Sequence, residues 1–247
     1  MKRFYLMSVY YSVVIPLKNE ESNIEELIQE LEPVMNQLRE TWELICIDDG
    51  STDNTKAILK KLNEEKGYLR SIFFKKNYGQ SSAFEAGFKA AQGKFIITLD
   101  GDRQNDPTDI PKLIKEINTC DLVCGIRLNR KDSWSKRMIS KGANFVRSRL
   151  CGDGMRDTGC SLKVYRASCF QKIKMYNGMH RFLPALFKIE GFEIKQIPVN
   201  HRERLKGKSN YNFFNRSLNT VSDLLAVCWM RKRHLHYQIE DDFSPKN

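Results

Sequence analysis

Short apolar runs alternate with amphipathic stretches through the first half of the chain. The runs are rich in β-branched and aromatic residues, and neighbouring positions within them are apolar, not only every second one. This pattern predicts strands buried on both faces, as in parallel sheets. We expect such strands at residues 11–16, 42–49, 71–75, 94–99 and 121–125.

Helical spacing of apolar residues fills the intervals between these runs. Ser22, with Glu25 three residues later, fits the start of a helix, and Pro33 predicts a kink or break within it. Further helices are expected from a cap at Asp53 to about Lys66, over residues 81–91 and over residues 108–118. Strands that alternate with helices predict an α/β fold with a mainly parallel twisted sheet flanked by helices.

The pattern loosens after about residue 149, where we expect only two further strands, at 161–165 and 192–199. A last helix over residues 212–233 is predicted to be amphipathic, because its apolar residues recur in steps of four and three. These are Phe214, Leu218, Val221, Leu225 and Cys228. We therefore expect one domain over residues 1–211, an amphipathic helix over 212–233, and a disordered acidic tail over 234–247.

The chain has a formal net charge of +11, which indicates an anionic partner: nucleic acid, a membrane surface or a phosphorylated ligand. Nucleic acid is disfavoured because the sequence has no aromatic-basic RNA-binding strands, no recognition-helix signature and no zinc spacing. The seven cysteines are scattered and form no CxxC pair. We expect free thiols in a reducing, cytosolic compartment.

Neither end of the chain predicts a membrane-inserted segment. The N-terminus has a basic start and an apolar stretch but no small-residue cleavage site, so we do not expect a signal peptide. The longest apolar run near the C-terminus is Leu224–Met230, much shorter than the roughly 18 to 20 residues that a spanning helix needs.

Polar residues collect where the first four predicted strands end. In open parallel sheets, ligands bind beyond the carboxyl ends of the strands. The strand ends carry PLKNE, DDGST, KKNYG and DGD, at residues 16–20, 48–52, 75–79 and 100–102. The sequence therefore predicts a binding site at this edge of the sheet.

The DGD segment is the strongest candidate for metal chemistry. Two carboxylates one residue apart, Asp100 and Asp102, suit Mg²⁺ or Mn²⁺ held jointly with a substrate diphosphate, and Gln104 adds a neutral oxygen. The same pair also fits a solvated turn. Asp106, just before Pro107, is expected to be a turn or cap residue.

Several of these segments together resemble a known family. IPLKNEESNI, ICIDDGSTDNT, NYGQSSAFEAGFKAAQG and LDGDRQNDP closely resemble, in order and spacing, the inverting family 2 glycosyltransferases with the GT-A fold. More narrowly, GIRLNRKD, KRMISKGAN, RDTGCSLKVYR, MHRFLPAL and HRERLKGKSNY are similar to the polyprenyl-phosphate glycosyltransferases of the dolichyl-phosphate mannose synthase type. The resemblance covers roughly residues 10–233 and implies that residues 1–211 form a GT-A catalytic domain.

The resemblance implies a role for each strand-end residue. Pro16, Lys18 and Glu20 would flank the nucleotide base, and Lys18 stands where relatives often carry tyrosine. Asp48 and Asp49 would lie near the base or ribose, although both also fit a turn. The donor diphosphate would be bound through Mg²⁺ or Mn²⁺ by the residues that match the family's DxDxQ pattern, Asp100, Asp102 and Gln104.

Residues in the second set of motifs match positions that hold the phosphates of donor and acceptor. These are Arg127, Lys136 or Arg137, Ser140, Arg204 and Ser209. The catalytic residues implied are Asp102, Arg127 and Arg204. Asp157 can position the sugar, orient a neighbouring arginine or form a turn. The four histidines, His180 included, are expected to be packing residues.

The implied reaction is attack by a lipid phosphate oxygen on the anomeric carbon of a UDP- or GDP-sugar, which inverts the configuration. A phosphate monoester has a second pKa of about 6, so it is already an anionic nucleophile at neutral pH and needs no general base. The site needs positive charge instead, to bring the phosphates together and to stabilise the departing diphosphate.

The acceptor implied is undecaprenyl or dolichyl phosphate, which places the protein at the cytoplasmic face of a membrane. The helix over 212–233 can lie in the interface with Arg231–Arg233 on the headgroups, or pack on the core or on a transmembrane partner subunit. Two alternative functions stay open: a GT-A glycosyltransferase with a glycan or other hydroxyl acceptor, and a non-catalytic scaffold subunit. VCWMRKR lacks the QxxRW pattern of processive synthases.

Overall fold

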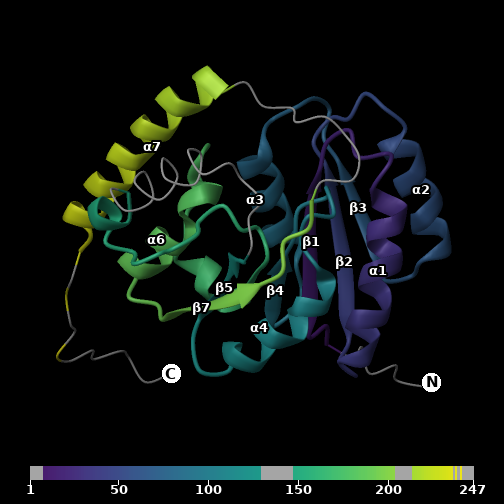
Figure 1. Ribbon diagram of the computed structural model, residues 1–247, viewed down its shortest axis with the longest axis horizontal. Coiled ribbons are helices and arrows are strands. Elements are labelled where there is room, and N and C mark those ends of the chain that lie inside the picture. Colours follow the sequence, from purple (N-terminus) through teal and green to yellow (C-terminus); the bar gives the residue numbers. More distant parts are fainter. Residues whose placement is uncertain (1–7, 129–146, 204–212, 236, 238–239, 241–247) are drawn as a thin grey trace, which may run out of the picture.

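A seven-stranded, mostly parallel sheet forms the centre of the computed structural model, which describes residues 8–128, 147–203, 213–235, 237 and 240 (Figure 1). The strand order is β3-β2-β1-β4-β6-β5-β7. Only β6 runs antiparallel to its neighbours, β4 and β5. The strands are β1 Tyr11–Leu17, β2 Trp42–Asp48, β3 Leu69–Phe73, β4 Phe95–Thr98, β5 Leu122–Arg127, β6 Lys163–Arg166 and β7 Ile194–Val199.

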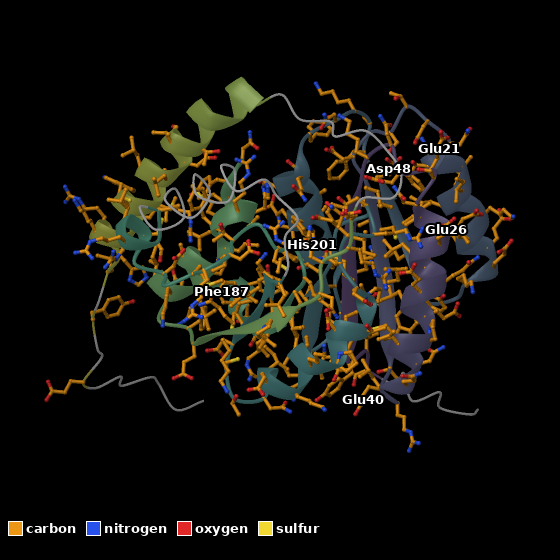
Figure 2. All side chains as sticks on the ribbon, viewed as in Figure 1. Glu21, Glu26, Glu40, Asp48, Phe187 and His201 are labelled. Carbon is orange, nitrogen blue, oxygen red and sulfur yellow. The ribbon has the colours of Figure 1, made fainter. Side chains whose placement is uncertain are left out.

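Helices cover both faces of this sheet. On one face lie α1 (Ile24–Gln37), α2 (Thr55–Glu65) and α4 (Ile110–Ile117), and on the other lie α3 (Gln80–Ala90) and α6 (Leu183–Ile189). Shorter 3₁₀ turns are η1 Pro107–Asp109, η2 Ala167–Gln171 and η3 Met179–Phe182. Figure 2 shows Phe187 of α6 well apart from Glu26 of α1 and Asp48 at the end of β2.

The continuous apolar runs follow from this arrangement, because both faces of each central strand are covered. In β1, Val13 and Ile15 pack with the α1, α2 and α4 layer, whereas Val14 packs with α3 on the opposite face. Val14 pairs in register with Ile45 of β2. Alternate side chains of one strand thus enter separate cores. The predicted α/β fold with a mainly parallel sheet is confirmed.

Several element boundaries differ from the sequence expectation; in α2, for example, Asn54 and not Asp53 is in the cap position. Helix α1 begins at Ile24 with Asn23, not Ser22, in the cap position. It continues through Pro33 to Gln37, so the expected break does not occur. Pro33 lies on the exposed face, where water can bind the carbonyl that lacks its helical donor. Strand β5 extends to Arg127, two residues beyond the predicted end.

Helix α7 (Phe213–Arg233) packs along α6 at the edge of the molecule (Figure 1). Val227 is fully buried in a small core with Phe182 and Leu186. Leu225 and Trp229 face outward and are each 64% exposed. The side chains of residues 213–219, including the predicted Phe214 and Leu218, lie outside the described part. Of the helices described here, none combines the length and hydropathy of a membrane span.

Candidate active site

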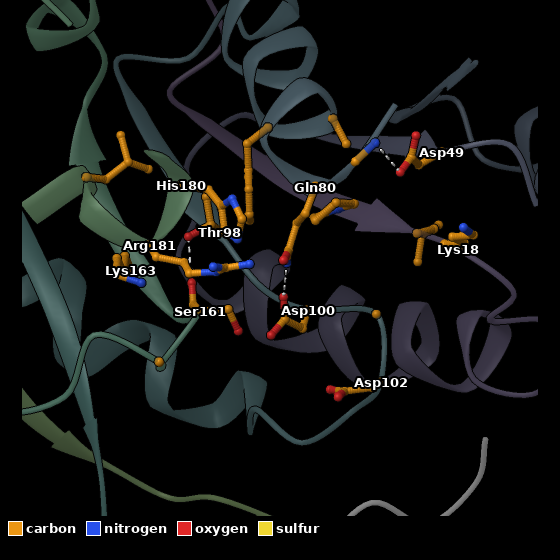
Figure 3. Close-up of a pocket in the computed structure, with 18 of the residues that line it drawn as sticks. Lys18, Asp49, Gln80, Thr98, Asp100, Asp102, Ser161, Lys163, His180 and Arg181 are labelled. Carbon is orange, nitrogen blue, oxygen red and sulfur yellow. Dashed lines mark hydrogen bonds between the residues drawn. The ribbon is translucent and has the colours of Figure 1, made fainter. Parts of the chain in front are cut away.

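A cavity of about 540 Å³ opens at the carboxyl ends of β1 and β4, between the start of α3 and the turn η3 (Figure 3). Its wall combines segments that lie far apart in the sequence. Eight residues named from the sequence line it: Pro16, Lys18, Glu20, Asp49, Asp100, Asp102, Gln104 and Arg127. The strand ends therefore meet at one site, as the parallel topology requires.

Other predicted site residues are placed differently. The Asp48 side chain is buried and does not line the cavity; its Oδ1 accepts a hydrogen bond from the backbone N–H of Ser51 at 2.9 Å. This is the geometry of a turn-forming aspartate. The remaining candidates lie outside the described residues: Lys136, Arg137, Ser140, Arg204 and Ser209.

The DGD loop approaches β1 closely at Gly101. A Cβ atom at this position would come within 2.4 Å of Leu17 Cδ2, so a larger residue here would require the Leu17 side chain to move. The left-handed backbone conformation is found at Arg103 instead, with φ of 59°. Asp102 Oδ1 accepts from the backbone N–H of Gln104 at 3.2 Å, which fixes the loop locally.

Ion pairs hold the strained Arg103 in place. Its guanidinium binds Glu26 and Glu30, both on α1. Glu30 also binds Arg202, which lies beyond β7 and pairs with Asp106 at 2.9 Å. The Arg202 backbone N–H donates to the Gln104 carbonyl at 2.9 Å. The loop that carries the two carboxylates is thus tied to α1 on one side and to the segment after β7 on the other.

Asp100 and Asp102 bring two carboxylates to the cavity wall. Burial raises the pKa of Asp100, and the neighbouring Asp102 carboxylate raises it further. The Gln80 amide donates to Asp100 Oδ1 at 3.0 Å. No cluster of three His, Cys, Asp or Glu suitable for a metal occurs among the described residues. Two carboxylates without a full protein cage fit Mg²⁺ or Mn²⁺ that shares its coordination with ligand phosphates.

The end of the cavity near Lys18 is built around Asp49. Its two carboxylate oxygens accept from the backbone N–H groups of Tyr78 and Gly79, at 2.6 and 2.9 Å. These bonds fix the loop that leads into α3. Asp106 does not line the cavity and instead accepts from the backbone N–H of Thr108 at 3.0 Å, which confirms its expected role as a cap.

Arg127 enters the cavity from the end of β5 and is oriented by Asp157. The carboxylate accepts from Nε and Nη2 at 2.8 Å each, a bidentate pair. The side chains are 15% and 8% exposed. Burial alone would raise the pKa of Asp157, but the Arg127 guanidinium and two backbone donors hold the pKa below its usual range. Two of the three roles open to Asp157 are present together: it orients Arg127, and its Oδ1 accepts from the backbone N–H of Gly159 at 3.0 Å, as in a turn.

Sequence reasoning missed part of the cavity wall: Gln80, Thr98, Lys163 and Arg181. His180, expected to pack, does so against Phe84, but it also lines the cavity and bonds Ser81 Oγ through Nδ1 at 2.6 Å. Ser81 and His180 are 99 residues apart in the chain. No local pattern signals such contacts. The one available signal was the position of Gln80 inside the NYGQSSAF segment.

Solved structures share this fold. Glucosyl-3-phosphoglycerate synthase from Mycobacterium tuberculosis, in complex with Mn²⁺, UDP and glucosyl-3-phosphoglycerate, superposes with a TM-score of 0.70 and 19% identity, over 90% of this chain and 80% of that one. The same enzyme with Mn²⁺ and UDP-glucose gives a TM-score of 0.69 and 18% identity, over 90% and 79% of the two chains. The GT-A type of fold expected from the sequence is confirmed.

Sequence relatives are more informative about the family. Dodecaprenyl-phosphate galacturonate synthase from Rhizobium johnstonii is 38% identical over 233 residues, which cover 92% of this chain and 69% of the relative. It confirms the narrower resemblance to polyprenyl-phosphate glycosyltransferases. The family model described as "Glycosyl transferase family 2" matches residues 12–174. This chain therefore belongs to glycosyl transferase family 2.

Proposed function

We propose that this protein transfers a sugar from a UDP- or GDP-sugar to the phosphate of a polyprenyl phosphate, with inversion at the anomeric carbon and with Mg²⁺ or Mn²⁺. The name of the Rhizobium relative supports a polyprenyl phosphate acceptor. The Mn²⁺ and UDP in the Mycobacterium complexes support a nucleotide donor and a divalent metal.

One observation carries this proposal: each carboxylate on the described cavity wall already has a hydrogen-bonding partner or a proposed metal-binding role. Asp49 accepts two backbone bonds, and Glu20 accepts from the Asn23 side chain at 2.7 Å. Asp100 and Asp102 suit a metal. Each carboxylate on that wall therefore already has a role, which favours an acceptor that needs no general base. A phosphate acceptor needs none, because it is already ionised.

The reaction forms a bond between the acceptor phosphate oxygen and the anomeric carbon. The bond from that carbon to the donor diphosphate breaks, and its electron pair leaves with the nucleoside diphosphate. No proton needs to be removed. A bound divalent metal would neutralise charge that develops on the leaving diphosphate. Asp100, Asp102 and Gln104 would hold this metal, and Asp49, Lys18, Glu20 and Pro16 would surround the nucleoside, with Asp48 fixing the neighbouring turn.

The remaining cations would act on the phosphates. Arg127, held rigid by Asp157, presents a guanidinium whose planar fork suits phosphate oxygens. We assign Arg127 and Arg204 to phosphate stabilisation during transfer. Lys136 or Arg137, Ser140 and Ser209 stay in the proposed phosphate-binding set on the strength of the sequence resemblance.

We place the protein peripherally at the cytoplasmic face of a membrane, where its lipid acceptor resides. The outward side chains Val221, Leu225 and Trp229 recur every four residues along α7. They form an apolar stripe beside the exposed basic residues Lys232 and Arg233. Such a surface fits an interface with anionic headgroups. A transmembrane partner subunit is the other occupant that this stripe suits.

The test is a glycolipid synthesis assay. Purified protein is incubated with detergent-solubilised undecaprenyl or dolichyl phosphate, Mg²⁺ or Mn²⁺, and a panel of UDP- and GDP-sugars, and products are identified by mass spectrometry. We expect one donor class to yield a sugar-phosphate lipid, and chelation of the metal to abolish the product. Glycosylation of a free saccharide with no glycolipid from any donor would instead favour the hydroxyl-acceptor alternative. Unchanged biological activity in Asp102→Ala would favour the scaffold alternative.

A further inference from the structure

One wall of the cavity carries positive charge that the sequence analysis did not assign. Lys163, His180 and Arg181 lie on one side of the cavity, Lys18 and Asp49 lie on the other, and Asp100 lies between them (Figure 3). Below, the residues Lys163, His180 and Arg181 are called the cationic wall. The nucleoside end and the cationic wall are thus separated by the metal-binding loop.

Lys163 is unusual because lysines are seldom buried and this one is only 5% exposed. Its ammonium donates to the Cys160 carbonyl, a neutral acceptor. An ammonium has three protons, so this bond leaves donors for a ligand in the cavity. Its charge is balanced in part by the Asp100 carboxylate. An anionic ligand that accepts from the remaining donors would offset more of the cost of burying the ammonium.

The rest of the cationic wall is fixed by other elements. Arg181 donates through Nη1 to Thr220 Oγ1 of α7 at 3.0 Å. His180 is held by Ser81 at the start of α3. Lys163 stands opposite Thr98 in the β4–β6 pairing, and Thr98 comes two residues before Asp100. The charges therefore belong to rigid parts of the fold and reach the same space as the metal-binding loop.

Inversion determines where the two phosphate groups must lie. The nucleophile and the leaving group occupy opposite sides of the anomeric carbon. If Asp100 and Asp102 hold the leaving diphosphate, the acceptor phosphate must lie across the sugar from them and away from the nucleoside. We propose that the cationic wall, with Lys163 and Arg181 as its charged contacts, binds the acceptor's phosphate monoester.

This assignment rests on the proposed function and adds residues to it. It also links the site to the membrane-facing side of the molecule, because Thr220 and the apolar stripe belong to the same helix. The competing role for Lys163 is to neutralise Asp100, in which case its loss would weaken metal and nucleotide binding instead. The two roles predict different binding defects.

The test measures binding without turnover. Farnesyl phosphate, a short water-soluble isoprenyl phosphate, is titrated calorimetrically into protein saturated with Mg²⁺ and UDP or GDP, with farnesol as the uncharged comparison. Lys163→Gln and Arg181→Gln should each weaken farnesyl phosphate binding at least about tenfold, because each removes a charge-assisted bond. Their affinity for the Mg²⁺–nucleotide should stay within about twofold of the wild type, a much smaller change than the loss of one charge-assisted hydrogen bond would cause.

Lys188→Gln is the matched control, since it removes one positive charge from an exposed position on nearby α6. It should bind farnesyl phosphate like the wild type. If buried Lys163 is required for folding, as thermal unfolding will show, Arg181→Gln carries the test alone.

Normal farnesyl phosphate binding in the variants, or weakened Mg²⁺–nucleotide binding in their place, would overturn the assignment. The experiments distinguish failure of the cationic-wall assignment from failure of the proposed function. If the wild type makes glycolipid while the variants bind farnesyl phosphate normally, only the cationic wall is refuted. If the wild type makes no glycolipid with any donor, the proposed function fails whatever the titrations show.

Discussion

Asp102 and Asp106 belong to one short loop and yet have separate tasks. Asp102 is buried on the cavity wall next to Asp100, whereas Asp106 caps η1 and pairs with Arg202. The sequence alone already separates them, because Asp106 directly precedes a proline and a threonine. This pair allows a matched comparison within one loop.

We predict that Asp102→Asn reduces kcat/KM for glycolipid synthesis roughly 100-fold or more, since it removes charge that balances the metal and diphosphate. Asp106→Asn should retain activity within about threefold, because asparagine also serves as a helix cap. Steady-state rates at saturating Mg²⁺ would measure both. Equal losses in the two variants would show that the loop acts only as a structural unit.

Asp157 allows a prediction about stability. We expect Asp157→Asn to lower the free energy of unfolding at pH 7 by about 3 kcal/mol, because it leaves the buried Arg127 guanidinium without its counter-charge. Urea unfolding would measure this loss. Arg166, whose pair with Asp121 is about 30% exposed, offers a comparison: Asp121→Asn should cost less than about 1 kcal/mol.

The same pair predicts a pH dependence. The pKa of Asp157 is lowered in the folded state, so its contribution is fully present above the unfolded pKa of about 4 and is lost as pH falls through the folded pKa. The stability difference between wild type and Asp157→Asn should therefore shrink below about pH 4. A difference that stays constant from pH 7 to pH 3 would contradict the charge pair as its cause.

The candidate residues that sequence reasoning found are those within one motif at a strand end. Asp100, Asp102 and Gln104 can be recognised because they lie close together in the chain and match one motif, and the structure places all three on the cavity wall. Lys163 and Arg181 cannot, since their role depends on contacts between β6, η3 and α7. Asp48 shows the converse, because neighbouring carboxylates look equivalent in sequence but only Asp49 lines the cavity.

For helices and strands, the sequence predicts that an element exists better than it predicts the residues at which the element begins and ends. Every strand of the sheet was expected from its apolar run, the partly exposed edge strands β3 and β7 included. The end of an element depends on which of several neighbouring residues takes the cap position. In α1 this is Asn23 instead of Ser22, and the Asn23 side-chain amide donates to Glu20. The antiparallel direction of β6 has no local signal, since it follows from the long connection after β5.

Helix α1 is tied through Glu30 to the loop that carries Asp100 and Asp102, which we propose to bind the metal. We predict that Glu30→Gln lowers the free energy of unfolding by about 2 kcal/mol, because two charge-assisted bonds to arginine are weakened. The Kd for Mn²⁺ in the presence of nucleotide should rise, since Arg103 loses a contact that maintains its strained backbone. Electron paramagnetic resonance of Mn²⁺ would measure it. Glu25→Gln, on the exposed side of the same helix, should change neither quantity.

Helix α7 has two faces with different expected roles. Replacing Leu225 and Trp229 together with serine should reduce binding to phosphatidylglycerol vesicles while leaving the thermal midpoint unchanged, because both side chains already face solvent. Val227→Ala should instead cost about 2 kcal/mol of stability, since it removes fully buried methyl groups. Vesicle co-sedimentation separates the two. Undiminished vesicle binding by the Leu225 and Trp229 double variant would refute the interfacial assignment.

Across the described part of the molecule, exposed and cavity-lining positive charge includes two groups of interest, one in the cavity and one at the end of α7. The formal net charge of +11 is compatible with several anionic partners, and the sign of the charge alone cannot choose among them. The structure places Arg127, Lys163 and Arg181 in one cavity and Lys232 and Arg233 at the end of α7. Positive charge therefore occurs both at the site proposed for phosphates and at the surface proposed for headgroups.

The central claim is that a lipid phosphate, and not a hydroxyl group, is the nucleophile. The most direct measurement compares vesicles that contain a polyprenyl phosphate with vesicles that contain the matching polyprenol, using the same nucleotide sugar and Mg²⁺, with product identified by mass spectrometry. We predict product only from the phosphate, and none after chelation of the metal. Equal or greater transfer to the polyprenol, or transfer that persists without a divalent metal, would contradict the account.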